Sequence, residues 1–164
     1  MTTRRKEASM RIHDILTHKS PDVWTIPSDR TVRDAIREMN SRKVGCLVVT
    51  DSGREIRGII TERDVLRMCG ERCAELEASA RHEEGCPARV ADVMTKEVLL
   101  AVPEDTVDYA MGVMTQNRVR HLPVVDDGLL VGLVSIGDLV RESLGETEYE
   151  NRLLKDYIRG VPVF

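Results

Sequence analysis

Hydrophobic residues recur with the spacing of an amphipathic helix in two separate stretches of the chain. Both stretches follow the i, i+3, i+4, i+7 rule, and their apolar positions are Val32, Ala35, Ile36 and Met39 in the first and Val107, Ala110, Met111 and Met114 in the second. Each stretch begins after a threonine, Thr31 or Thr106, whose hydroxyl is a good N-cap. The sequence therefore predicts two similar helices, each with one buried face.

Short runs of aliphatic, β-branched residues follow each predicted helix. They cover residues 46–50 and 56–60 after the first helix, and residues 122–125 and 129–134 after the second. A turn signal separates the members of each pair, Asp-Ser-Gly or Asp-Asp-Gly, so each pair predicts a β-hairpin. Another helix is expected after each hairpin, and its apolar side would carry Val65, Leu66 and Met68 in the first case and Leu139, Val140 and Leu144 in the second.

The same order of elements twice over indicates an internal duplication. The matching segments are Asp14-Ile-Leu-Thr17 with Asp92-Val-Met-Thr95, Ile26-Pro27 with Val102-Pro103, and Gly58-Ile-Ile-Thr-Glu-Arg-Asp64 with Gly132-Leu-Val-Ser-Ile-Gly-Asp138. Each copy predicts strand–helix–strand–strand–helix, an α+β unit with one sheet face that another copy can cover.

The remaining segments complete the predicted domain organisation. We expect a flexible arm over 1–9, the first repeat over 10–69, a helical connector over 70–89 that ends near Gly85 and Pro87, the second repeat over 90–145, and an amphipathic helix and tail over 146–164.

Composition and charge exclude several classes of function. Hydrophobic residues make up 41% and charged residues 32% of the 164 residues, which favours a folded chain. Only 3% are aromatic and the net charge is −4, so we expect neither base stacking nor electrostatic attraction to nucleic acid. No apolar run approaches the roughly 20 residues of a membrane span, and the basic start lacks the apolar segment of a secretory signal. Four cysteines form no dense disulfide framework, so we expect a cytoplasmic protein.

The duplicated segments resemble a tandem pair of CBS domains, the arrangement called a Bateman module, over about residues 10 to 145. The resemblance implies two β-α-β-β-α repeats packed through their sheets with a pseudo-two-fold axis. It also implies that adenosine-containing ligands such as AMP, ATP, NAD or S-adenosylmethionine bind in clefts between the repeats. Such a module usually pairs with another, so a homodimer is expected.

Two matched motifs, Thr61-x-x-Asp64 and Ser135-x-x-Asp138, are the strongest candidates for a binding site. A hydroxyl at a helix start and a carboxylate three residues later lie together, and this pairing is common as a capping device alone. The same geometry suits a nucleotide, because an ionised aspartate accepts bonds from both ribose hydroxyls while the cap hydroxyl and nearby amides face phosphate. The resemblance implies this second role, and the two roles are compatible.

Candidate phosphate-binding residues differ between the copies. Arg63 lies inside the first motif, where a surface ion pair with a neighbouring carboxylate is the alternative. Arg120 and His121 precede a strand of the second copy, at a place where similar modules put phosphate-binding basic residues, although a solvated strand edge would explain them too. The first copy has Gly45 and Cys46 there. We therefore expect two clefts of unequal affinity.

The adenine slot is assigned by the resemblance alone. It implies that one slot lies near Thr17 and Val23 and the other near Thr95 and Val98. Backbone groups around Gly45-Cys46 or Arg120-His121 would then meet the edge of the base.

Neither a metal centre nor a catalytic centre is expected. Four soft ligands, Cys69, Cys73, His82 and Cys86, could hold zinc, but their spacing matches no compact finger, so we expect separate structural residues. No hydrolase, phosphate-loop or dinucleotide fingerprint is present, so we expect no enzyme and no obligatory cofactor.

The sequence thus predicts a regulatory or sensor module whose ligand is AMP or ATP and which acts on an unidentified partner protein. A module for NAD(H) or S-adenosylmethionine is one alternative. A structural dimerisation or docking module with vestigial clefts is the other.

Overall fold

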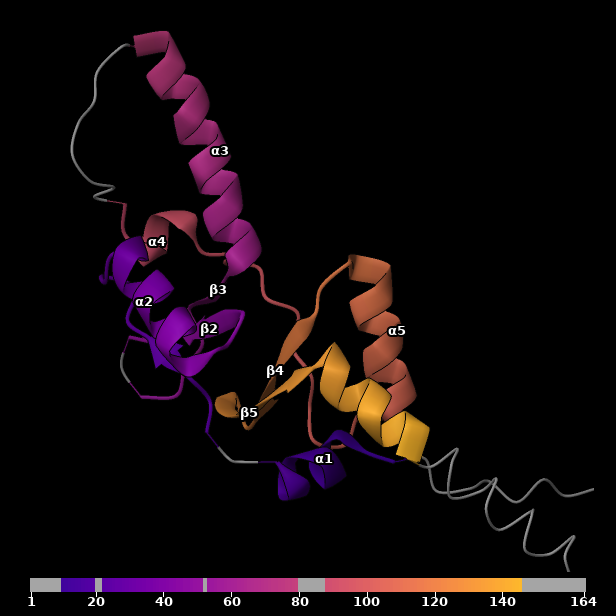
Figure 1. The fold of residues 1–164 in the computed structure, drawn as a ribbon. Helices are drawn as coiled ribbons and strands as arrows, with labels where there is room; N and C mark the ends of the chain where they lie inside the picture. The colour runs from indigo at the N-terminus through magenta and orange to yellow at the C-terminus, as the bar shows by residue number, and fades with distance from the viewer. Residues whose placement is uncertain (1–9, 20–21, 52, 80–87, 146–164) are drawn as a thin grey trace, which may run out of the picture. The chain divides into compact units, whose positions relative to one another are not determined.

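The computed structural model describes residues 10–19, 22–51, 53–79 and 88–145, with residues 72–79 described by their backbone. The chain divides into two compact units (Figure 1). Unit 1 takes the residues up to 21, residues 101–124 and the residues from 133 onward, whereas unit 2 takes residues 22–100 and 125–132. The structure is mixed α+β, as predicted.

Unit 2 is built on a three-stranded sheet in the order β1-β2-β3. Strand β1 (Thr25–Ile26) pairs in parallel with β2 (Cys46–Val49), which pairs antiparallel with β3 (Gly58–Thr61). Three helices accompany the sheet, and they are α2 (Val32–Arg42), α3 (Glu62–Ser79) and α4 (Val90–Val93). Their buried side chains form one aliphatic core, which comprises Ile26, Val32, Ala35, Met39, Leu47, Val49, Ile60 and Val90.

Unit 1 contains α1 (Ile12–His18), α5 (Val107–Asn117) and a helix over residues 136–145. Strands β4 (His121–Asp126) and β5 (Leu129–Ser135) form a two-stranded sheet, and the residues of their hairpin tip belong to unit 2. The core of unit 1 comprises Ile12, Ile15, Ala101, Val107, Ala110, Met114, Leu122, Val124, Val134 and Leu139.

The two repeats exchange their leading helices. Helix α1 comes from the first repeat, yet Ile12 is fully buried in unit 1 and its N–H donates to the Asp105 carbonyl at 2.9 Å. Helix α4 opens the second repeat, yet Val90 is fully buried in unit 2 and its N–H donates to the Arg30 carbonyl at 2.8 Å. Each unit therefore combines the body of one repeat with the start of the other.

Local signals in the sequence predicted the helix starts and the second hairpin correctly. The Thr31 hydroxyl accepts a bond from the Asp34 N–H at 3.1 Å, and the Thr106 hydroxyl accepts one from the Tyr109 N–H at 3.2 Å. In the second hairpin, Asp127 and Gly128 have φ values of 48° and 78°. Positive φ at both central residues is the type I′ turn that an Asp-Gly pair favours between strands.

Two features of the helices differ from the prediction. Helix α3 continues without a break through Gly70 to Ser79, so the last helix of the first repeat and the start of the predicted connector are one element. The prediction that Leu66, Val140 and Leu144 face a core is wrong, because they are 71%, 42% and 59% exposed. These helices pack against the core on one side only, and Leu139 is accordingly fully buried one residue before Val140.

Several predicted segments lie outside the described residues. These are the arm over 1–9, the end of the connector with Gly85 and Pro87, and the helix and tail over 146–164. Within the described part of the chain, no helix is both long enough and apolar enough to cross a membrane.

Candidate functional site

The first candidate carboxylate, Asp64, closes a reciprocal cap at the start of α3. Its Oδ2 accepts bonds from the Thr61 N–H at 2.9 Å and the Thr61 hydroxyl at 2.7 Å, while the Asp64 N–H donates back to that hydroxyl at 3.3 Å. The predicted capping arrangement is therefore present. Asp64 is only 4% exposed, and its partners are polar rather than hydrophobic.

The other oxygen of Asp64 contacts residues from two different segments. Oδ1 accepts a bond from the Thr95 hydroxyl at 3.1 Å and forms an ion pair with Arg67, one turn further along α3. Thr95 belongs to the second repeat, whereas Asp64 belongs to the first. We call Thr61, Asp64, Arg67 and Thr95 the Asp64 site.

A glycine lets the second repeat approach this closely. The Ile59 N–H donates to the Thr95 carbonyl at 3.0 Å, and the Thr95 N–H donates to the Ile59 carbonyl at 2.9 Å. A Cβ on Gly58 would lie 2.7 Å from Met94 Sδ and 2.8 Å from the Thr95 carbonyl oxygen. Since real contacts of a Cβ are longer, a side chain at Gly58 would displace the segment that carries Thr95.

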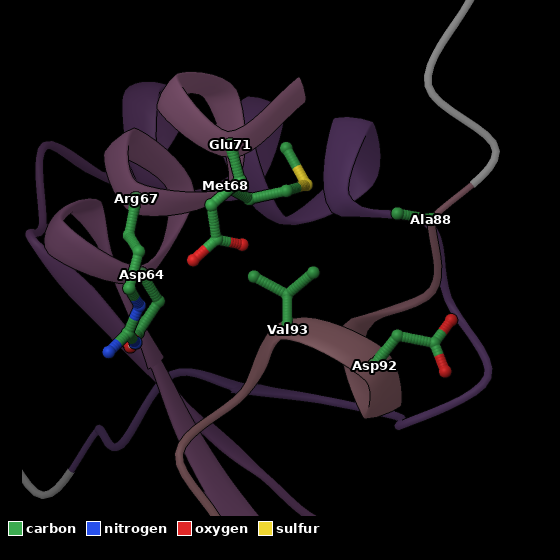
Figure 2. Close-up of a pocket in the computed structure, with 7 residues that line it drawn as sticks. All are labelled: Asp64, Arg67, Met68, Glu71, Ala88, Asp92 and Val93. Atoms are coloured by element: carbon green, nitrogen blue, oxygen red, sulfur yellow. The ribbon is translucent and has the colours of Figure 1, made fainter. Parts of the chain in front are cut away.

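A pocket of about 440 Å³ opens beside Asp64, between α3 and α4 (Figure 2). It is lined by Asp64, Arg67, Met68, Glu71, Ala88, Asp92 and Val93. Figure 2 shows the Glu71 carboxylate and the Val93 side chain pointing toward one another across it. The volume suits a small molecule, and three carboxylates against one arginine make the lining acidic. Of the predicted site residues, only Asp64 lines this pocket.

The second candidate carboxylate, Asp138, repeats the cap but has a different third partner. Its Oδ2 accepts bonds from the Ser135 N–H and hydroxyl, both at 2.8 Å, and the Asp138 N–H donates to that hydroxyl at 3.2 Å. Lys19 Nζ donates to the same Oδ2 at 2.6 Å and to the Leu133 carbonyl at 3.1 Å. Arg141 Nη1 lies 4.0 Å from Oδ1. We call Lys19, Ser135, Asp138 and Arg141 the Asp138 site.

The pKa of Asp138 lies below its ordinary value. Burial is the largest effect and raises the pKa, but the Lys19 hydrogen bond, the two Ser135 bonds and the Lys19 charge together lower it further than burial raises it. The carboxylate is therefore ionised at neutral pH, the state that accepts hydroxyl donors.

Backbone pairing places the predicted strand residues beside these helix starts. The Ile136 N–H donates to the Arg120 carbonyl at 2.9 Å, and His121 begins β4. In unit 2 the Glu62 N–H donates to the Gly45 carbonyl at 3.1 Å, and Cys46 pairs with Thr61 across the sheet. Each copy thus brings its two predicted positions next to its own Thr or Ser.

The remaining predicted residues have mixed placements. Arg63 is exposed on the first turn of α3, and the ion pair at Asp64 comes from Arg67. Thr17 is exposed, and its hydroxyl donates within α1 to the Asp14 carbonyl at 2.7 Å, unlike its counterpart Thr95. Val23 and Val98 are half-buried in unit 2.

Sequence reasoning missed the cations that contact both carboxylates. Arg67 and Arg141 stand three residues after Asp64 and Asp138, so the repeat alignment carried a signal for them. Lys19 carried none, because it meets Asp138 only through the exchange of α1 between the repeats.

Among the cysteines, Cys46 is buried and Cys69 is exposed, and neither forms a disulfide in the described part of the chain. No group of three or more possible metal ligands occurs within the described ranges. The Cys73 side chain, His82 and Cys86 lie outside the described residues, so the zinc alternative is not tested.

A duplicated α+β repeat, with leading helices exchanged and a Thr/Ser-x-x-Asp cap in each copy, defines a paired-domain architecture. The model of the CBS domain matches residues 12–71 and 90–145, so the chain belongs to the CBS-domain family. The chain is 37% identical over 161 residues to the Arabidopsis thaliana mitochondrial CBS domain-containing protein CBSX3, covering 93% of this chain and 73% of that relative.

Solved structures share the fold. A CBS-domain containing protein from Agrobacterium tumefaciens superposes with a TM-score of 0.72 at 33% identity, over 82% of this chain and 99% of that one. The structure of CBSX2 in complex with AMP gives a TM-score of 0.68 at 24% identity, over 84% of this chain and 98% of that one, and at this identity it shows the fold alone.

Proposed function

We propose that this chain is a regulatory module that binds adenosine-containing ligands, with AMP or ATP as the physiological ligand. The observation that carries the proposal is the pair of matched helix starts in which a serine or threonine and an ionisable aspartate are met by the leading segment of the other repeat. An aspartate of this kind suits a ribose diol, and a helix start suits phosphate. The AMP complex of the neighbour CBSX2 lends support.

Regulation follows from the exchange of helices. In this proposal a ligand that binds Asp64 also contacts the segment around Thr95, and a ligand that binds Asp138 also contacts the segment around Lys19. Ligand binding would then favour one arrangement of the two repeats over another, and a partner protein would read that difference. We propose a regulatory role without a catalytic step.

The ligand question is tested by calorimetric titration of the folded protein with AMP, ATP, NADH and S-adenosylmethionine. We expect binding of AMP or ATP, and we expect Asp138→Ala to weaken it. Stronger binding of NADH or S-adenosylmethionine would replace the ligand but keep the class of function. If none of the four binds at millimolar concentration, the sensor function is wrong and a purely structural docking module takes its place.

A homodimer of such pairs is the second part of the proposal. Helical apolar side chains exposed in each unit support it, and they are Leu66 (71%) in unit 2 and Tyr109 (59%), Val140 (42%) and Leu144 (59%) in unit 1. Leu66 and Val140 also occupy matching positions of the two repeats. Light scattering after size exclusion should give twice the 18.5 kDa chain mass, and Leu66→Ser should shift the equilibrium toward monomer. A wild-type chain that stays monomeric at every concentration would contradict this part.

A further inference from the structure

Each carboxylate is paired with an arginine, but the two sites differ in the sign of the further charges beside them. At Asp138, two cations approach a single carboxylate, Lys19 at 2.6 Å and Arg141 at 4.0 Å. At Asp64, the adjoining pocket holds two further carboxylates, Glu71 and Asp92, against the single arginine. An anionic ligand is therefore favoured at the Asp138 site and disfavoured in the pocket beside Asp64.

The aligned repeats show the same reversal at one position. Lys19 follows Asp14 by five residues, and the residue that follows Asp92 by five is Glu97. The position that places an ammonium on Asp138 in one copy therefore carries the opposite charge in the other. The difference in charge between the sites therefore arises in the leading segments, which are the parts that the repeats exchange.

Lys19 would compete with a ribose diol that donates to both carboxylate oxygens of Asp138. Oδ2 of Asp138 already accepts two bonds from Ser135, and the Lys19 ammonium takes a further position on it. A neutral diol that displaced the ammonium would replace an ion pair with hydrogen bonds from uncharged hydroxyls and would leave Lys19 without its anion. A ligand that also carries phosphate offers the ammonium a replacement anion.

The Lys19 side chain can make such an exchange. It is 35% exposed, compared with 14% for the Asp138 side chain, and its four-carbon stem moves the charge without backbone rearrangement. The bond to the Leu133 carbonyl keeps the ammonium at the site while its anion changes.

We propose that Lys19 determines the specificity of the Asp138 site, pairing with Asp138 in this structure and with a ligand phosphate once a ribose diol takes its place. The site therefore accepts phosphorylated nucleosides and discriminates against neutral nucleosides. This inference rests on the proposed nucleotide-binding function and adds the ligand class of one site.

Calorimetric titration with AMP and with adenosine tests the proposal in the wild type, Lys19→Met and Lys19→Glu, where the last variant gives this position the charge of Glu97. The binding event considered is the one that Asp138→Ala weakens. We expect wild type to prefer AMP over adenosine by about tenfold or more, since a hydrogen bond to a charged group is worth that much. Lys19→Met should reduce the preference about tenfold, and Lys19→Glu should make adenosine the better ligand.

A matched control removes the same charge elsewhere. Arg33 is exposed on α2 in unit 2, and Arg33→Met should leave the ratio of the two Kd values unchanged. If Lys19→Met binds AMP but keeps the wild-type ratio, Lys19 is a structural ion pair only and the proposal is wrong, while the nucleotide-binding function stands. If wild type binds neither AMP nor adenosine, the specificity proposal is wrong, and the titrations with ATP, NADH and S-adenosylmethionine decide separately whether the sensor function stands.

Discussion

The Asp64 and Asp138 sites share the same helix cap and differ in the residue that the other repeat packs against it. In both, a hydroxyl and an aspartate cap a helix with nearly the same distances. At Asp64 the segment from the other repeat contributes a neutral hydroxyl, whereas at Asp138 it contributes an ammonium. The comparison teaches that duplication repeats what lies within a few residues, while contacts between segments far apart in the chain are free to diverge.

The largest expected difference between the sites is in stability. Asp64 is 4% exposed and accepts from three polar partners, so Asp64→Ala removes all of these bonds at once and should lower the free energy of unfolding by about 3 kcal/mol. Asp138 is more exposed, so Asp138→Ala should cost about 1 to 2 kcal/mol. Urea unfolding followed by circular dichroism measures both. Asp126→Ala, at an exposed aspartate, is the control, and equal costs at Asp64 and Asp138 would contradict the comparison.

The next largest effect on stability is expected at Gly58, where the segment that carries Met94 and Thr95 approaches closely. Gly58→Ala should destabilise the protein by about 2 kcal/mol, because the added methyl overlaps Met94 and the Thr95 carbonyl. It should also weaken ligand binding at the Asp64 site while leaving binding at the Asp138 site unaffected.

Gly112 offers a matched control on α5, where an added Cβ meets nothing within 4 Å. Gly112→Ala should therefore stabilise the protein by about 0.5 to 1 kcal/mol through helix propensity. Similar thermal unfolding of the two variants would show that the Gly58 contact is not tight.

The costs of removing the two threonine helix caps should differ by less. Thr31 and Asp34 exchange bonds in both directions, whereas the cap at Thr106 has no reciprocal acid at Tyr109. Thr31→Ala and Thr106→Ala should each cost about 1 kcal/mol, with Thr31→Ala the more costly because it also removes a partner of Asp34. Urea midpoints measured side by side decide this, and a larger loss at Thr106 would reverse the expected order.

The smallest expected effect is the contribution of Asp138 to the loss of stability at acid pH. Its pKa in the folded protein lies below the unfolded value of about 3.9, so ionised Asp138 stabilises the fold above that pH and loses this contribution as pH falls through the folded pKa. Asp14, Asp34 and Asp51 also have lowered pKa values and contribute to the same loss of stability in acid. The contribution of Asp138 is therefore measured by comparing wild type with a variant at this position. Asp138→Asn should flatten the loss of stability below about pH 4 relative to wild type. An unchanged slope would contradict the ion pair with Lys19.

The parts of the fold that the sequence predicted are those whose causes are local. The apolar stripe on α2, the threonine caps and the Asp-Gly turn each depend on residues within a few positions, and all three are present. The run of α3 through Gly70 was missed because an isolated glycine costs a helix only about 1 kcal/mol.

The candidate site was predictable to the same extent. The two aspartates and their caps followed from the motif, whereas Lys19 did not, since 119 residues separate it from Asp138. Only the tertiary exchange of the leading helices brings the two together, and no periodicity or spacing encodes such a contact.

The claim that both aspartates serve to hold a ribose diol is tested most directly by comparing AMP with an AMP analogue whose ribose lacks both hydroxyls, in calorimetric titrations of the wild-type chain. The account predicts that the analogue binds about 10-fold to 100-fold more weakly, since each aspartate then loses its hydroxyl donors. Equal affinity of the two compounds would contradict it.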